Sequence, residues 1–556
     1  MLTISLRTYF AGALFMVMVL MLGCSPAAQT PTNPGSPSGT SIGTDEVNTK
    51  APFLTKGEPK YGGILRRAQI DDPPNFDLYS NSTNAMQNVT WPAYNNLLIF
   101  DPYNFSKIIP DLAEKWEVSP DGKQVTFHLR QAVKFSNGTP MTAKDVKFSF
   151  DWMRSPPSGL VSTRQGGLEP IDRIDIVDDF TVRITLNRPY AGFLPTLAQG
   201  WMAIYSKDYA ESKGHDIYKK EMMGTGAFKL KEYVRGTSVT LEKNPNYWQS
   251  GVPYLDGVQM FMIPDPGTRF AAFRTGQVDL FGLNADQENQ IRTTLGDKIN
   301  IQNQDSISWQ TLNMNAKRKP FDNMQVRQAI SYAIDRPGFI KAIQGGLGRA
   351  GGYVPPTSQY ALPPEELAKL PGYGPDAAAN KAQAKKLLTD AGFPTGFETT
   401  FTVRKGQEDL AVYLTDQLKQ VGIATAPMKI LDSGPAYDAA VKLDFDMLPW
   451  GHGLALDDPD AHYSELYVCG AFRDYSGLCD MKVNELYIKQ SQELDPAKRK
   501  PLVWDMEKYA IPLQIKIILS WGKAQLGTWS YVKGYVQDPS AGGYNVNHYK
   551  QIWMDK

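Results

Sequence analysis

The strongest structural signal in this sequence lies in Ile109–Phe150, which reads IPDLAEKWEVSPDGKQVTFHLRQAVKFSNGTPMTAKDVKFSF. Within it, Val125, Phe127 and Leu129 alternate with polar residues, and this period of two indicates a strand with one buried face. The preceding Pro120-Asp121-Gly122 predicts a turn, because proline fixes φ and glycine accepts a positive φ. The stretch therefore predicts a strand that is entered through a tight turn.

Further strand and helix patterns follow along the chain. A second half-buried strand is predicted in TVRITL, residues 181–186. In VRQAISYAIDR, the apolar residues that share one face of a predicted helix are Val326, Ile330, Ala333 and Ile334. We expect Asp322 or Asn323 to cap this helix, and we predict another helix over Asn380–Ala391. Strands and helices mixed in this way predict an α/β fold.

The composition of the 556 residues is that of a globular protein and excludes several classes. At roughly 100–200 residues per domain, the length suggests two to four domains. Lys+Arg and Asp+Glu both number 58, so the chain lacks the basic excess of a nucleic-acid-binding protein. Three cysteines without a C-x-x-C pair exclude a disulfide scaffold and a thioredoxin-type site. We expect neither a metal nor a cofactor.

Two enzyme-like motifs do not fit their surroundings. Gly346–Gly351 matches G-x-G-x-x-G, but a helix is predicted before it and Pro355 and Pro356 follow it, so a glycine-rich connector is the better interpretation. Gly39–Gly43 matches G-x-S-x-G in a Ser/Thr/Pro/Gly-rich segment, whereas a nucleophile elbow requires a rigid strand–turn–helix. The sequence therefore predicts that the protein is not an enzyme.

Residues 1–23 have the features of a secretory signal peptide. Arg7 precedes a run without charges, residues 9–22, that is too short to span a bilayer comfortably. Met21-Leu22-Gly23-Cys24 resembles the lipobox of bacterial lipoproteins, in which the cysteine is lipidated and the peptide is cut before it. The resemblance implies lipidation at Cys24, and the alternative is an ordinary cleaved signal with an incidental cysteine. Residues 24–56, rich in Ser, Thr, Pro and Gly, predict a flexible tether.

Five segments of the chain resemble the extracellular solute-binding proteins of family 5, the peptide/nickel-type binding components of ABC importers. They are Ile109–Phe150, Gly224–Trp248, Arg274–Leu280, Asn315–Asp335, and Ala382–Gly392 together with the Cys469–Cys479 region. They follow one another in the order of the family and span nearly all of the chain after residue 56. The resemblance implies an α/β fold of the periplasmic-binding-protein type, with two lobes, an inserted subdomain and a ligand cleft between the lobes.

The resemblance also implies how the chain divides. The expected large lobe consists of residues 57–93, 206–308 and 526–556, the inserted subdomain of residues 94–205, and the second lobe of residues 309–525. A ligand that contacts both lobes only in the closed form closes the hinge between them. The expected partners are a small-molecule or short-oligomer solute and the ABC permease subunits. We expect a monomer outside the cytoplasm, attached to a bacterial membrane by its lipid.

Aromatic and polar residues in two stretches are candidate ligand contacts. The candidates are Trp450, Gly451, His452 and Asp457 in one stretch, and Asn84, Trp91 and Tyr94 in the other. Trp450 offers a ring face and one N–H donor, which suit a sugar, a ring or a cation. The alternatives are core packing for the aromatic residues, a solvated loop position for the histidine, and a turn with a helix start for the acidic cluster at residues 457–462.

One ligand contact of the peptide-binding members is missing from the sequence. In those proteins, the acid three places after the tryptophan pairs with the α-ammonium of the peptide, and counting from Trp450 places Gly453 there. A buried ammonium without a counter-charge is costly. The resemblance therefore favours a neutral or anionic solute, and the alternative is an oligopeptide held by Asp457 or Asp458.

Cys469 and Cys479 lie ten positions apart and remain once Cys24 is lipidated. An oxidising compartment predicts a disulfide between them, and the alternative is two free thiols.

Two other functions stay open beside transport. A secreted hydrolase is disfavoured because no motif supplies a nucleophile with its base. A receptor that reports ligand occupancy to a sensor kinase has the same sequence features as a transport protein. The solute itself also stays open among an oligopeptide, an oligosaccharide, an opine-like solute and a metal chelate.

Overall fold

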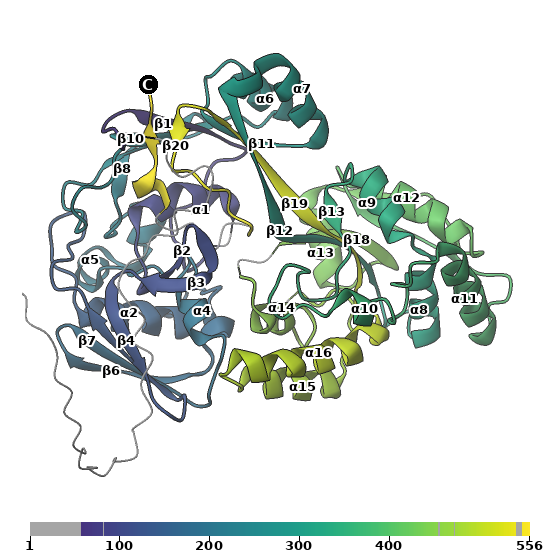
Figure 1. Cartoon of the computed structure of the whole chain (residues 1–556). Coiled ribbons are helices and arrows are strands. Elements are labelled where there is room, and N and C mark those ends of the chain that lie inside the picture. The colour runs from purple at the N-terminus through teal and green to yellow at the C-terminus, as the bar shows by residue number, and fades with distance from the viewer. Residues whose placement is uncertain (1–56, 82, 454–455, 472, 541–547) are drawn as a thin grey trace, which may run out of the picture. The chain divides into compact units, whose positions relative to one another are not determined.

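The computed structural model describes residues 57–81, 83–453, 456–471, 473–540 and 548–556. The predicted signal peptide, the tether and Cys24 lie outside these residues. Among the helices of the described residues, none combines the length and the apolar character needed to cross a bilayer. Strands and helices follow one another along the whole described chain, which confirms the predicted α/β class (Figure 1).

The largest sheet within the described residues has nine strands and collects segments from most of the chain. Its order is β18-β12-β19-β11-β1-β10-β9-β8, with β13 paired to β19. The strands are β1 (Ile64–Gln69), β8 (Phe228–Val234), β9 (Ser238–Lys243), β10 (Gly257–Met262), β11 (Leu280–Leu283), β12 (Ile299–Met314), β13 (Gly348–Arg349), β18 (Met447–Gly453) and β19 (Ile517–Trp529). β1 runs parallel to β10 and β11, and the other pairs are antiparallel.

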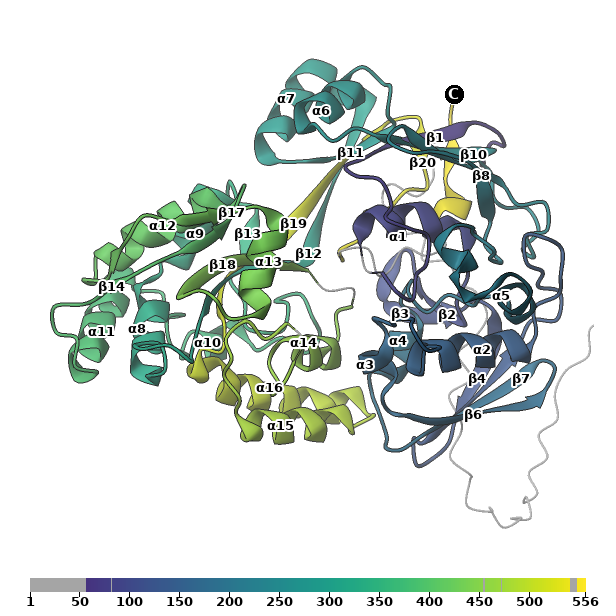
Figure 2. The same ribbon diagram turned by 180° about the vertical axis from the view of Figure 1, so that it is seen from behind.

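β12 and β19 are the longest paired strands and lie side by side in both views (Figures 1 and 2). Their register is regular as far as the pair Asp305 and Lys523, shifts before Trp309 pairs with Trp521, and shifts again after Gln310. Such bulges bend a strand and increase its twist. The side chain of Asp305 lies 3.1 Å from Arg349 and 4.0 Å from Lys523, so an ionic cluster accompanies the first shift.

A four-stranded antiparallel sheet lies inside the predicted inserted subdomain, in the order β4-β5-β7-β6. Its strands are β4 (Ala113–Val118), β5 (Gln124–Leu129), β6 (Ile171–Asp178) and β7 (Thr181–Leu186), and α2 (Ala143–Arg154) packs on β6 and β7. Val125, Phe127 and Leu129 are buried, and Gly122 adopts φ 68° in the turn before β5. The strand and the turn predicted from this stretch are confirmed.

The remaining strands form two-stranded sheets. They are β2 (Leu98–Asp101) with β3 (Asn104–Pro110), β14 (Glu398–Thr399) with β16 (Ala424–Thr425), β15 (Thr402–Arg404) with β17 (Lys429–Leu431), and β20 (Val532–Lys533) with β21 (Trp553–Met554). The other helices are α1 (Asn84–Thr90), α3 (Gln165–Leu168), α4 (Phe193–Leu197), α5 (Lys207–Lys213), α6 (Pro266–Arg274), α7 (Ala285–Leu295), α8 (Met324–Ala333), α9 (Arg336–Ile343), α10 (Pro364–Leu367), α11 (Ala377–Asp390), α12 (Glu408–Lys419), α13 (Ser433–Val441), α14 (Pro459–Leu466), α15 (Met481–Ser491) and α16 (Pro496–Leu513). Short 3₁₀ turns occupy Trp91–Ala93, His215–Lys219, Gly296–Lys298 and His548–Gln551.

The predicted helices form, with shifted ends. Asn323 caps α8, since its side chain accepts a hydrogen bond from the backbone N–H of Gln325 at 2.8 Å. α8 ends at Ala333, so Ile334 is not on its face; Ile334 is extended and buried because Asp335 already caps the next helix. α11 begins three residues before the predicted start, where Asp376 accepts hydrogen bonds from two backbone N–H groups.

Two large hydrophobic clusters hold the chain together. The first contains residues as far apart as Leu65 and Met554, and the second joins β12 and β15 to helices α8, α11 and α12. The lobe boundaries stay predictions. Cys469 and Cys479 are bonded with their Cα atoms 4.6 Å apart, which confirms the predicted disulfide.

Candidate functional site

Trp450, Gly451 and His452 are consecutive residues in the middle of β18. β18 pairs with β12, so that Trp450 stands opposite Thr311 and His452 opposite Trp309. The interpretation of His452 as a loop residue between two glycines is therefore wrong. The two glycines fit the strand because Gln310 lies against Gly451, where a Cβ would be 3.3 Å from its side-chain amide.

Trp450 is largely enclosed by protein. Only 6% of the residue is exposed, and its ring packs edge-on against Tyr475 at 5.8 Å between centroids. The guanidinium of Arg404 lies over the ring at 5.1 Å. Little of the Trp450 ring is therefore open to a ligand, and its role as a ligand contact stays a prediction.

His452 is buried between aromatic rings and is neutral. Its ring stacks on Trp309 at 5.3 Å and on Tyr475 at 5.7 Å, and 4% of the residue is exposed. Burial lowers the pKa of His452 well below its usual value, and the charges of Arg473 and Lys516 lower it further. A guanidinium nitrogen of Arg473 lies 3.4 Å from Nδ1. Since guanidinium can only donate, Nδ1 accepts and the proton resides on Nε2.

Three cationic side chains surround this end of β18. Lys516 is buried, and its ammonium donates to the Asn313 side chain at 3.2 Å and to the Arg473 carbonyl at 3.0 Å. Burial lowers the pKa of Lys516 to about 8, which leaves the group mostly charged at pH 7. Arg473 pairs with Glu465 at 3.3 Å, while no carboxylate of the described residues lies within 4.0 Å of Arg404. Glu465 beside Arg473 and Asp474 near Lys516 offset two of these positive charges, and Arg404 carries the third.

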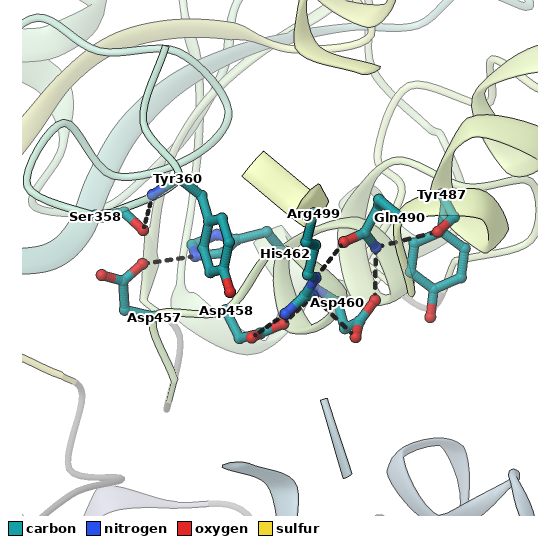
Figure 3. A network of polar contacts seen from close by, with 9 residues as sticks. All are labelled: Ser358, Tyr360, Asp457, Asp458, Asp460, His462, Tyr487, Gln490 and Arg499. Carbon is teal, nitrogen blue, oxygen red and sulfur yellow. Dashed lines mark hydrogen bonds and ion pairs between the residues drawn. The ribbon is translucent and has the colours of Figure 1, made fainter. Parts of the chain in front are cut away.

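The acidic cluster after β18 is built mainly around one arginine (Figure 3). Asp458 caps α14 and binds both terminal nitrogens of Arg499, at 2.7 and 2.8 Å. Asp460 lies 3.0 Å from the same guanidinium and accepts a hydrogen bond from Gln490 at 2.6 Å. All three charged groups are buried. The interpretation of this cluster as a turn with a helix start is confirmed, and its two deeper carboxylates are neutralised internally.

Asp457 has a different environment from Asp458 and Asp460. Its carboxylate lies 4.0 Å from Nε2 of His462 (Figure 3). It also hydrogen-bonds Ser358, and a quarter of the side chain is exposed. Burial raises the pKa of Asp457 to about 7 and lowers the pKa of His462 to about 3. The histidine is therefore neutral at pH 7.

A cavity of about 930 Å³ lies on the other candidate stretch. Its walls come from β1, α1, α6, β11 and the segment after β20, and they include Arg67, Gln69, Asn88, Trp91, Arg269 and Tyr535. Trp91 packs edge-on against Trp201 at 5.7 Å, and its indole N–H has no hydrogen-bond acceptor among the described residues. A cavity of this size fits a small solute.

The other two candidates of this stretch are Asn84 and Tyr94. Asn84 is the first residue of α1, and its side chain is outside what the structure describes. Tyr94 is completely buried and packs against Tyr205 at 5.3 Å, so it belongs to the hydrophobic core. Among the described lining residues, the cavity includes Trp91 but none of the β18 candidates.

Sequence reasoning did not single out Arg404, Arg473 or Lys516. Lys516 carries a usable signal, because it is a lone charge in the apolar run IPLQIKIILS at residues 511–520. No comparable signal marks Arg404 or Arg473. Among the described residues, no group of three or more His, Cys, Asp or Glu side chains is arranged to hold a metal ion.

Residues 107–474 match the model of the family described as "Bacterial extracellular solute-binding proteins, family 5 Middle". The chain belongs to this family. Among curated relatives, it is 30% identical over 367 residues to heme-binding protein A of Haemophilus influenzae, covering 60% of this chain and 64% of that protein. It is 32% identical over 363 residues to glutathione-binding protein GsiB of Salmonella typhi, covering 65% and 68% of the two chains. These relatives are solute-binding proteins and not enzymes.

Solved structures of the family share the fold. DppA from Helicobacter pylori, in complex with the peptide STSA, superposes with a TM-score of 0.77 at 27% identity and covers 89% of this chain and 99% of its own. AgaA from A. tumefaciens, in complex with agropinic acid, gives a TM-score of 0.72 at 26% identity with the same coverage. The periplasmic-binding-protein-like α/β fold implied by the resemblance is thereby confirmed.

Proposed function

We propose that this chain is the lipid-anchored solute-binding component of an ABC importer, which captures a solute between two closing lobes and delivers it to a membrane permease. Membership of family 5 is the observation that carries this proposal. The run without charges ending at Cys24 supports the anchor, and the cavity at Trp91 supports solute capture. Mass spectrometry of small molecules that copurify with the protein from its native host tests it, and recovery of no solute at stoichiometric amounts contradicts it.

The solute is proposed to be neutral or anionic. Gly453 stands where peptide-binding members carry the acid for an α-ammonium, and Arg404, Arg473 and Lys516 make the same region cationic. An ammonium there lacks one charge-assisted hydrogen bond of about 1.5–3 kcal/mol and also meets like charges. A carboxylate or a neutral polar group meets donors in the same place.

Calorimetry with a panel of solutes tests this preference. Unmodified di- to pentapeptides are expected to bind at least ~10-fold more weakly than the copurified solute, a difference of about 1.4 kcal/mol. Trp450→Ala is expected to remove most of the affinity for that solute. Trp504→Ala is the control for the loss of a tryptophan elsewhere, because this half-buried residue lies on α16 and not on β18.

An oligopeptide-binding function is the second candidate, and the environment of Asp457 favours it. A quarter of this side chain is exposed, so a peptide ammonium can reach its carboxyl. Submicromolar binding of free-N-terminus peptides that is lost both on N-acetylation and in Asp457→Asn establishes this candidate and overturns the neutral or anionic solute.

A further inference from the structure

Two segments that are 300 positions apart in sequence meet next to Asp460. The backbone N–H of Ala191 donates to the carbonyl of Ser491 at 2.8 Å. Ala191 lies between β7 and α4, within the predicted inserted subdomain, and Ser491 is the last residue of α15, within the predicted second lobe. We call this contact the subdomain seam, formed by Tyr190, Ala191 and Gly192 on one side and Asp460 and Ser491 on the other.

Gly192 is needed in the seam for its size and not for its backbone conformation. Its φ of −75° and ψ of 0° are accessible to any residue. A Cβ at this position, however, would lie 2.7 Å from Oδ2 of Asp460 and 3.0 Å from the ring of Tyr190. Contacts below 3.0 Å force one of the partners to move, so a methyl group here pushes the two sides of the seam apart.

Asp460 cannot easily move out of the way. Its carboxylate is held by Arg499 at 3.0 Å and by Gln490 at 2.6 Å, and the residue is buried (Figure 3). Tyr190 is also buried, and its pKa is raised well above its usual value first by burial and then by the charge of Asp460. Gly192 therefore faces two buried side chains, of which Asp460 is held in place by its contacts.

A second point of contact lies beside the first. The side chain of Leu494, three residues after α15, occupies the space where a side chain on Gly122 would stand. Pro189 lies on the other side of the same glycine, at 3.4 Å from that Cβ position. The turn before β5 and the loop after β7 thus both touch the end of α15.

We propose that the subdomain seam is a latch that holds the predicted inserted subdomain and second lobe in the closed arrangement, with Gly192 as its positioning residue. This inference rests on the proposed function, because a latch matters only for a protein whose lobes close on a solute. The hydrogen bond from Ala191 and the packing at Leu494 are made only while the two segments touch. The closed arrangement is thereby favoured in the chain itself, before any solute contributes.

Hydrogen–deuterium exchange of the full-length chain in detergent tests the latch without a ligand. A backbone amide that donates a hydrogen bond exchanges only when the contact opens. Gly192→Ala is expected to raise the exchange rate of the peptides around Ala191 and Leu494 at least ~10-fold. Gly166→Ala in α3 is the matched control, because a Cβ there meets nothing within 4 Å. Leu494→Ala, at a residue that is 43% exposed, is expected to raise the same rates several-fold without endangering the fold.

Three results overturn the latch. They are fast exchange at Ala191 already in the wild type, wild-type rates in both Gly192→Ala and Leu494→Ala, or an equal rise in Gly166→Ala. None of them decides solute capture, which depends on the molecules that copurify with the protein.

Discussion

Arg499 lies between the buried carboxylates of Asp458 and Asp460, and its removal leaves two negative charges without a cation. We expect Arg499→Met to lower the free energy of unfolding by about 3–5 kcal/mol at pH 7. Urea denaturation measures this loss. Lys498→Met is the control. The Lys498 side chain is exposed, and its contact with Asp495 at 4.0 Å adds little to the free energy of unfolding.

The loss in Arg499→Met depends on pH in a defined direction. Burial already raises the pKa of Asp460 to about 6, although the charge of Arg499 lowers it, and without the guanidinium this pKa rises further above that of the unfolded chain. A raised carboxyl pKa costs stability only once the unfolded chain ionises, so the cost grows as the pH rises. The variant is therefore less destabilised at pH 5 than at pH 7. An equal loss at both pH values contradicts the assigned charge pairing.

Asp457 provides a second pH-dependent test. Burial raises the pKa of its carboxyl from 3.8 to about 7. Its ionisation therefore opposes folding, with a cost that appears between about pH 4 and pH 7 and stays above that range. Asp457→Asn is expected to match the wild type near pH 4 and to be more stable by at least about 1 kcal/mol at pH 8, as measured by urea denaturation. Asp297→Asn is the control, because Asp297 is exposed. If Asp457→Asn is no more stable than the wild type at pH 8, the raised pKa of Asp457 is wrong.

At the scale of elements, the disulfide closes a loop that supports the candidate site. The segment from Cys469 to Cys479 carries Arg473 and Tyr475, which contact His452. Replacing both cysteines by alanine is expected to lower the free energy of unfolding by roughly 2–3 kcal/mol, since the closed loop is short. Denaturation of the double variant and of the wild type under reducing conditions measures the loss, and the two losses should agree. A double variant as stable as the oxidised wild type refutes this estimate.

The elements that sequence reasoning predicted are those with a strong local pattern. The alternation of Val125, Phe127 and Leu129 is sufficient to predict β5, and Asn323 predicts the start of α8. The strand assignment of His452 could not be predicted, because β18 is fixed by pairing with β12, some 140 positions away. The cations beside β18 come from β15, from the residue before β19 and from the disulfide loop, so they come together only when the chain has folded.

At the scale of the whole molecule, the proposed lipid anchor at Cys24 can be tested directly. Cys24→Ser is expected to abolish lipidation and to alter processing of the signal peptide. Metabolic labelling with a radioactive fatty acid, membrane fractionation and electrophoretic mobility measure this. Cys469→Ser is the control, because it removes a cysteine of the folded body and leaves the lipobox intact. A Cys24→Ser protein that stays in the membrane fraction with unchanged mobility contradicts the anchor.

The nine-stranded sheet places β1, close to the start of the described chain, next to β10 and β11 from its middle, and β11 in turn pairs with β19 near its end. β12 and β19 pair along most of their length. If one predicted lobe unfolds, strands of the other lobe therefore lose their hydrogen-bonding partners. Differential scanning calorimetry should therefore show one endotherm with equal calorimetric and van't Hoff enthalpies. For the same reason, a truncation within either strand is expected to yield material that proteases degrade throughout, and no trimmed, stable half.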